Sequence, residues 1–139
     1  MKKMIIKQLK KLNNIALKHG DVPVSCIIVK NNKIIAKEYN KRQKKNSPLA
    51  HAEILAIIKA TKRIKTWNLN DCELYVTLEP CEMCRYYIKE SRIKKVHYLL
   101  PKLENKKLYQ KTEFIEDNTD EKMKENYRKI LQDFFINKR

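Results

Sequence analysis

The amino-acid sequence predicts an α/β protein in which helices cover both faces of one sheet. Segments with apolar residues at helical spacing alternate with short runs of β-branched residues, which is the pattern of layered α/β folds. The chain has 139 residues, of which 42% are hydrophobic, so one domain with a sizeable core fits its length. Because the sequence shows no internal repeat and no long linker, we expect residues 1–139 to form a single domain.

The first half of the chain predicts a helix, a hairpin and a second helix. Apolar residues three and four positions apart predict an amphipathic helix over residues 4–18, and Gly20 follows it where a glycine commonly ends a helix. Residues 22–30 are apolar and β-branched and predict a buried strand, with residues 33–38 as its hairpin partner. A polar loop leads to Pro48, after which apolar residues recur at helical spacing for about four turns.

The second half predicts two more strands and two more helices. Residues 73–78 and residues 95–100 have the composition of strands. Between them Pro80 stands at the first turn of a helix, where its missing N–H costs least. Apolar residues at helical spacing then predict a final helix over about residues 120–137.

Composition excludes several function classes. The single glycine, Gly20, excludes phosphate-binding loops, dinucleotide fingerprints and nucleophile elbows, since each needs two or more glycines at fixed offsets. No apolar stretch is long enough for a membrane span or a secretory signal, so we expect a cytoplasmic protein with no membrane association.

The net charge of +16 favours a polyanionic partner, because lysine and arginine side chains on phosphates release counterions. A general bias of the sequence towards lysine is the alternative explanation. The lysines of residues 41–45 and 89–95 are the expected phosphate contacts.

Two short motifs combine the side chains of a catalytic zinc site. His51 and Glu53 stand at the start of one predicted helix, and Pro80-Cys81-Glu82-Met83-Cys84 stands at the start of another. Cys81 and Cys84 are three residues apart and share one helix face. One histidine and two cysteines suit zinc and leave the fourth tetrahedral position to a water, as in catalytic rather than structural sites.

The other cysteines and Glu53 each allow a second interpretation. Cys72 lies a strand length of roughly 20 Å or more from Cys81, whereas Cys26 is harder to exclude as a ligand. We interpret both as ordinary buried cysteines, in keeping with a reducing compartment. Glu53 could simply complement the helix dipole, but beside His51 it is placed to move protons between a water, the substrate and the leaving group.

The combination of H-x-E and P-C-x-x-C resembles the zinc-dependent nucleobase deaminases. Further segments are similar to bacterial tRNA adenosine deaminases at similar mutual spacing: Val22-Pro23-Val24, Asn40, Pro48 to Ile54, Leu74 to Cys84, Ser91-Arg92-Ile93 and, more weakly, Leu131 to Phe135. The resemblance implies a three-layer α/β/α cytidine-deaminase-like sandwich with a five-stranded mixed sheet, usually as a homodimer. It also implies that His51, Cys81 and Cys84 bind one zinc ion, that Glu53 shuttles protons, and that Asn40 and the backbone of Ala52 hold the base.

The chain departs from the family pattern in three places. Ser25-Cys26 replaces the usual Gly-Ala, and the bulky Arg85, Tyr86 and Tyr87 replace small residues after the second zinc cysteine. Residues 100–110 replace a glycine-containing loop that contacts RNA in the family. These changes affect the expected RNA specificity and dimer contact, and they leave the zinc motifs intact.

Three functions follow from these observations. The leading hypothesis is hydrolytic deamination of adenosine to inosine in RNA, at the wobble position of a tRNA anticodon stem-loop. The alternative is a zinc-dependent deaminase of free bases or nucleosides, such as cytosine, guanine or adenosine, which the missing glycine loop favours. The third is a zinc module without catalytic activity that binds nucleic acid, and it requires a fourth protein ligand.

Overall fold

A computed structural model of the chain describes residues 1–102 and 112–137. The chain divides into two compact units, Met1–Glu104 and Asn105–Arg139. The expectation of a single domain stays a prediction. No helix among the described residues is long and apolar enough to cross a membrane.

The first unit contains a mixed sheet of four strands in the order β2-β1-β3-β4. β1 pairs antiparallel with both β2 and β3, whereas β3 and β4 are parallel. The strands agree with those expected from the local sequence: β1 (Ser25–Lys30), β2 (Lys33–Tyr39), β3 (Cys72–Leu78) and β4 (Lys95–Leu100).

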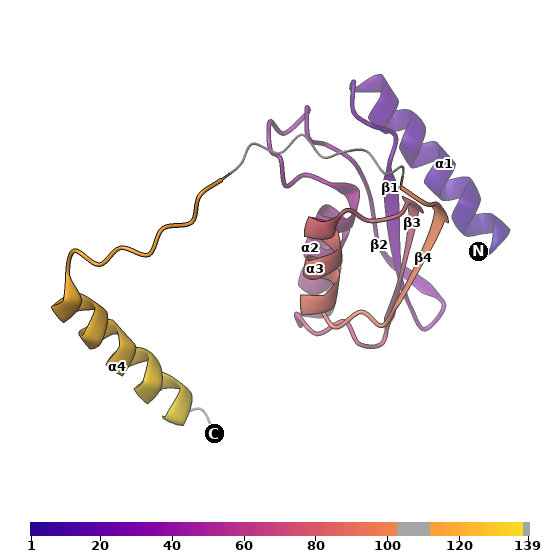
Figure 1. Cartoon of the computed structure of the whole chain (residues 1–139). Helices are drawn as coiled ribbons and strands as arrows, with labels where there is room; N and C mark the ends of the chain where they lie inside the picture. Colours follow the sequence, from indigo (N-terminus) through magenta and orange to yellow (C-terminus); the bar gives the residue numbers. More distant parts are fainter. Residues whose placement is uncertain (103–111, 138–139) are drawn as a thin grey trace. The chain divides into compact units, whose positions relative to one another are not determined.

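Helices cover both faces of this sheet, as the alternating pattern predicted. α1 (Lys3–Lys18) lies on one face, and α2 (Ala52–Ile64) and α3 (Glu82–Glu90) lie on the other (Figure 1). Successive side chains of β1 point to opposite faces of the sheet, so the core consists of two clusters, one on each face. Cys26 and Ile28 pack in one cluster with residues of α2 and α3, while Ile27 packs with residues of α1.

The expectation of five strands was wrong for the part of the chain that the structure describes, where the sheet has four. The fifth strand came from the family resemblance, since the sequence pattern itself indicated four. After β4, the apolar pair Phe114-Ile115 stands between Glu113 and Glu116, which is shorter than the four to eight apolar residues of a buried strand. Residues 112–120 contain no strand, and Phe114 and Ile115 are exposed.

The second unit contains α4 (Glu121–Asn137), where the sequence analysis expected a helix over about residues 120–137. The carboxylate of Asp120 accepts a hydrogen bond of 2.9 Å from the backbone N–H of Met123, which satisfies one of the free donors of the first turn. No side chain of α4 is buried.

Strand direction brings the loops that carry the motifs to one edge of the sheet. β2 and β3 are both antiparallel to β1, so they run in the same direction, and β4 is parallel to β3. The carboxyl ends of these strands therefore meet at a single edge, where ligands bind in many open α/β sheets. α2 and α3 both begin from this edge, after β2 and β3 respectively.

Candidate metal centre

The three expected zinc ligands lie at the N-termini of α2 and α3. His51 is the residue before the first turn of α2, and Cys81 has the same position before α3, both with extended backbone. Cys84 follows in the first turn of α3 and is fully buried. Their ligand atoms all lie within 4.8 Å of one another, so two motifs that are 30 residues apart in the sequence form one group.

The separations of these atoms fit zinc. The Nδ1 atom of His51 is 3.5 Å from the Sγ atom of Cys84 and 3.8 Å from that of Cys81. Tetrahedral coordination with ordinary zinc–sulfur and zinc–nitrogen bonds puts such atoms about 3.6 Å apart. The donor set and its geometry therefore suit a tetrahedral ion bound by three side chains.

Neither Cys26 nor Cys72 joins this group. Among the described residues, the one cluster of potential ligands contains His51, Cys81 and Cys84 only. Cys26 is buried in the hydrophobic core, where burial, followed by the charges of Glu53 and Glu38, raises the pKa of its thiol. Cys72 pairs with Lys30 at the other end of β1. Both are core cysteines, as expected.

Hydrogen bonds among the three ligands shift the pKa values of their side chains. Hydrogen bonds from Cys84 and then from His51 lower the pKa of Cys81 to about 3, so its sulfur is a thiolate. The hydrogen bond to Cys81 raises the pKa of His51. The bond that Cys84 donates to Cys81, together with burial, raises the pKa of Cys84, which gives up its proton when a metal replaces that bond.

Glu53 lies beside the ligand cluster without belonging to it. It is the second residue of α2 and only 4% exposed, and burial is the largest cause of its raised carboxyl pKa. A hydrogen bond with the Cys84 thiol acts in the opposite direction. A buried carboxyl group with a raised pKa holds a proton more readily than a free carboxylate, which suits a group that accepts and delivers protons.

A cavity of about 210 Å³ opens beside these groups. Its wall is formed by residues from every loop at this edge of the sheet: Val22, Val24, Asn40, Arg42, His51, Glu53, Leu78, Glu79, Cys81 and Lys102. The structure thus brings together the expected residues His51, Glu53, Cys81 and Asn40 in one pocket.

Asn40 presents an unsatisfied acceptor in this pocket. Its backbone N–H donates to the carbonyl of Val24 at 2.9 Å, which fixes the residue at the end of β2. The side chain is buried, but its Oδ1 atom has no hydrogen-bond partner. An unpaired buried amide oxygen is costly, so this atom is available to a ligand that donates a hydrogen bond.

The expected role of Ala52 concerns its backbone and stays a prediction, while several residues of the pocket wall were not expected. Ala52 is the first residue of α2, and its side chain packs in the core and not in the wall of the pocket. The sequence analysis assigned no role to Leu78, Glu79 or Lys102. Leu78 and Glu79 precede the second motif directly, which was an available signal, whereas no local pattern around Lys102 indicates its position.

Known proteins resemble the chain in sequence and structure. Residues 1–100 match the cytidine and deoxycytidylate deaminase zinc-binding region. A tRNA-specific adenosine deaminase of Aquifex aeolicus is 53% identical over 81 residues, which are 58% of this chain and 54% of that protein. One of Bacillus subtilis is 44% identical over 94 residues, or 68% of this chain and 56% of that protein.

Two solved structures share the fold and at least 30% identity. A structure from work on tRNA:A34 deaminases, which edit A to I at the wobble position, has a TM-score of 0.68 and 31% identity, covering 70% of this chain and 75% of that one. Guanine deaminase from Bacillus subtilis has a TM-score of 0.67 and 37% identity, covering 73% and 66%.

The chain spans less than two thirds of the length of the relatives that it matches in sequence. The chain spans 54% of the Aquifex aeolicus protein and 59% of a tRNA-specific adenosine deaminase of Rickettsia bellii. The match to the zinc-binding region nevertheless covers all four strands and all three ligands of the cluster. The chain therefore belongs to the family of the cytidine and deoxycytidylate deaminase zinc-binding region.

Proposed function

We propose that this protein deaminates adenosine to inosine in RNA, at the wobble position of a tRNA anticodon. The observation that carries the proposal is the pocket in which His51 and Cys81 of the three-ligand cluster adjoin the buried carboxyl of Glu53 and the unpaired amide oxygen of Asn40. The tRNA-specific adenosine deaminases that the chain resembles, and the related tRNA:A34 deaminase structure, support this choice of substrate.

The zinc centre and Glu53 divide the reaction between them. Zinc held by His51, Cys81 and Cys84 would supply a water of lowered pKa at neutral pH. In the net reaction water would add its oxygen to C6 of adenine, and the C6–N bond would break to release ammonia. Glu53 accepts a proton from the water and delivers protons to the ring nitrogen and the leaving amine. Its burial and raised pKa support this role.

Asn40 and Ala52 hold the base in the proposed complex. The Oδ1 atom of Asn40 is the free acceptor of the pocket, and a donor on the base or ribose would satisfy it. The backbone of Ala52 begins α2, where N–H groups lack intrahelical partners and are available to an acceptor on the base.

A deaminase of free nucleobases is the alternative, and the structural likeness to guanine deaminase favours it. A comparison of substrates separates the two. The zinc-loaded chain is incubated with an anticodon stem-loop, with free adenosine and with guanine, and products are identified by mass spectrometry. Inosine in the stem-loop and no turnover of the free compounds supports the proposal. Turnover of a free base or nucleoside alone contradicts it.

We also propose a cytoplasmic homodimer, following the expectations from sequence. Four free cysteines agree with a reducing compartment. Light scattering of the zinc-loaded chain measures the assembly, since a monomer has a mass of 16.7 kDa and a dimer twice that value. A monomeric mass at micromolar concentration would contradict the dimer.

A further inference from the structure

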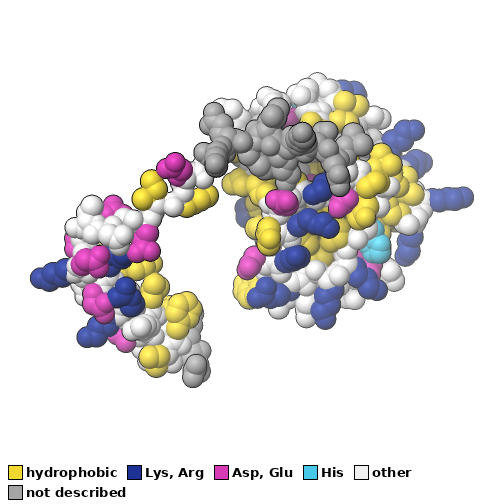
Figure 2. Space-filling model, viewed as in Figure 1, with side chains coloured by type: hydrophobic (Ala, Val, Ile, Leu, Met, Phe, Trp, Pro, Cys, Tyr) yellow, Lys and Arg dark blue, Asp and Glu magenta, His cyan; other side chains and the backbone are white. Residues whose placement is uncertain are grey.

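Two cations, Arg42 and Lys102, line the zinc pocket from different loops. We propose that they bind the phosphate groups on either side of the target nucleotide, so that the pocket selects a base within a polynucleotide. This inference deepens the proposed function and rests on it. Figure 2 shows many lysine and arginine side chains on the visible face of the first unit, and only Arg42 and Lys102 among the described cations line the zinc pocket.

Arg42 stands on a loop that hydrogen bonds hold in place. The buried carboxylate of Asp21 accepts bonds from the backbone N–H groups of Gln43 at 2.8 Å and Lys44 at 3.4 Å. The backbone carbonyl of Arg42 accepts a bond of 3.0 Å from the N–H of Ser47. The position of Arg42 beside the pocket is therefore set by the fold, although its side chain is exposed.

Two of its lysine neighbours are engaged elsewhere, and the third, Lys45, does not line the pocket. The ammonium of Lys41 forms an ion pair of 2.9 Å with the buried Glu38, and Lys44 donates a hydrogen bond of 3.2 Å to the hydroxyl of Tyr39. No acidic side chain in the described ranges lies within ion-pair distance of the Arg42 guanidinium. Arg42 is thus the cation of this loop that both lines the pocket and is available to an anion.

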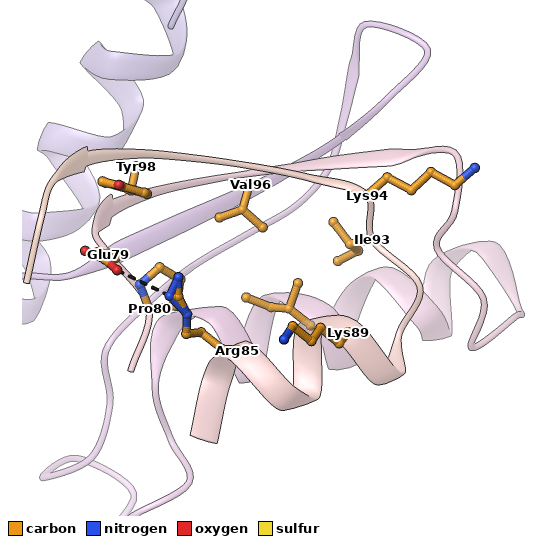
Figure 3. A pocket seen from close by; sticks show the side chains of 9 residues that line it. Glu79, Pro80, Arg85, Lys89, Ile93, Lys94, Val96 and Tyr98 are labelled. Carbon is orange, nitrogen blue, oxygen red and sulfur yellow. Dashed lines mark hydrogen bonds and ion pairs between the residues drawn. The ribbon is translucent and has the colours of Figure 1, made fainter. Parts of the chain in front are cut away.

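Lys102 is held at the pocket through Glu79. The backbone N–H of Glu79 donates to the carbonyl of Leu100 at 2.8 Å, and the N–H of Lys102 donates to the Glu79 carboxylate at 3.3 Å. Arg85 forms an ion pair of 3.3 Å with that carboxylate (Figure 3). Arg85 thus compensates the charge of Glu79, and among the described residues the Lys102 ammonium forms no ion pair.

The pocket wall contains the acidic Glu53 and Glu79 as well as the two cations. Glu79 is paired with Arg85, so the two cations of the wall are open to an anionic substrate. A free base or nucleoside is uncharged and gives Arg42 and Lys102 no partner. A nucleotide within a chain carries one phosphate on each side, and cations on two separate loops can meet both. Arginine additionally offers a planar pair of donors that matches phosphate oxygens.

Equilibrium binding tests the assignment without turnover. The zinc-loaded full chain carries Glu53→Gln in this experiment, so that no reaction occurs. Fluorescence anisotropy measures its affinity for a labelled anticodon stem-loop at several salt concentrations, from low to moderate. Each phosphate contact contributes about 0.7 to the slope of log affinity against log salt for single-stranded RNA. Arg42→Gln and Lys102→Gln should each lower the slope by about this amount. The matched control Lys62→Gln removes an exposed lysine that does not line the pocket and should lower it less.

Neutral RNA linkages then identify the contacts as phosphates. Replacing either phosphate beside the target adenosine by a methylphosphonate should weaken binding to the chain that retains Arg42 and Lys102. The same replacement should have little effect where Arg42→Gln or Lys102→Gln has already removed its partner. Additive losses, or slopes equal to that of Lys62→Gln, overturn the inference.

A turnover assay on the same stem-loop distinguishes failure of the phosphate assignment from failure of the proposed function. If the wild-type chain deaminates the stem-loop but Arg42→Gln and Lys102→Gln have the same salt slope as Lys62→Gln, the proposed function stands and the phosphate assignment fails. If the wild-type chain acts on free nucleosides and neither binds nor deaminates the stem-loop, both fail.

Discussion

The inner end of the pocket is built from two helix N-termini embedded in the core, whereas its rim is built from two loops held mainly by hydrogen bonds. Cys84 is 0% exposed and Glu53 4% exposed at the inner end, while Arg42 at the rim is exposed to solvent. Charges at the inner end therefore act in a medium of low dielectric constant, and those at the rim are screened by water and salt.

This difference separates chemistry from affinity. Changes at the inner end should reduce turnover by a large factor at any ionic strength. Changes at the rim should alter the affinity for a charged substrate by a smaller factor that depends on salt. The variants below test that division, beginning with the largest expected effect.

Cys84→Ala should remove zinc and all deaminase activity, because two remaining ligands bind the ion weakly. The metal content should fall from one ion per chain to almost none, and the melting temperature should no longer respond to added zinc. Elemental analysis and thermal denaturation measure both. Cys72→Ala is the matched control, since it truncates a buried cysteine at the start of β3, away from the zinc ligands, and should retain zinc. Full zinc content in Cys84→Ala would show that the cluster is not the metal site.

Glu53→Gln should keep zinc and lose at least about 100-fold in turnover, since the amide cannot accept the proton. The stem-loop should still bind, because the substitution preserves size. Turnover is measured by conversion of adenosine to inosine, and Glu90→Gln, at the exposed end of α3, serves as the control. A Glu53→Gln enzyme as active as this control would remove the proton shuttle from the mechanism.

The ligands of the zinc cluster could be predicted from sequence because each motif is short and local. Cys84 lies one turn after Cys81, so their spacing places both sulfur atoms on one helix face. The approach of His51 to them depends on the common direction of β2 and β3, and the sequence indicated it only through the combination of the two motifs. The four strands could be predicted for a similar reason, since each is a short segment rich in apolar, aromatic or β-branched residues. The fifth strand depended on the resemblance, and the described residues after β4 lack such a segment.

The pocket wall was harder to predict because it is not local. Asn40 looks like an ordinary turn asparagine in the sequence, and it enters the pocket because β2 and β3 run in the same direction. Lys102 reaches the same pocket through the contact of Glu79 with the end of β4. Neither position follows from spacing, since each depends on strand order and on hydrogen bonds between distant segments.

Asn40→Ala should lower kcat/KM by about 10- to 100-fold while leaving stability nearly unchanged, because the lost amide bonds the substrate and not the protein. Its Oδ1 atom has no partner in the folded chain, so no internal hydrogen bond is removed from the side chain. Steady-state kinetics and denaturant unfolding measure the two effects. A large loss of stability with unchanged kcat/KM would assign Asn40 to the scaffold instead of the site.

The smallest effect is expected for the second cationic surface of the first unit. Lys89 and Lys94 line a groove of about 280 Å³ between α3 and β4, which lies apart from the zinc ligands and shares Glu79 with the pocket (Figure 3). The double change Lys89→Gln and Lys94→Gln should alter the affinity for the stem-loop less than Arg42→Gln alone, because neither lysine lines the zinc pocket. Anisotropy at several salt concentrations measures the slopes. A change in the salt slope larger than that of Arg42→Gln would mean that the RNA also crosses α3. Phosphates would then be bound both at the rim of the zinc pocket and at this groove.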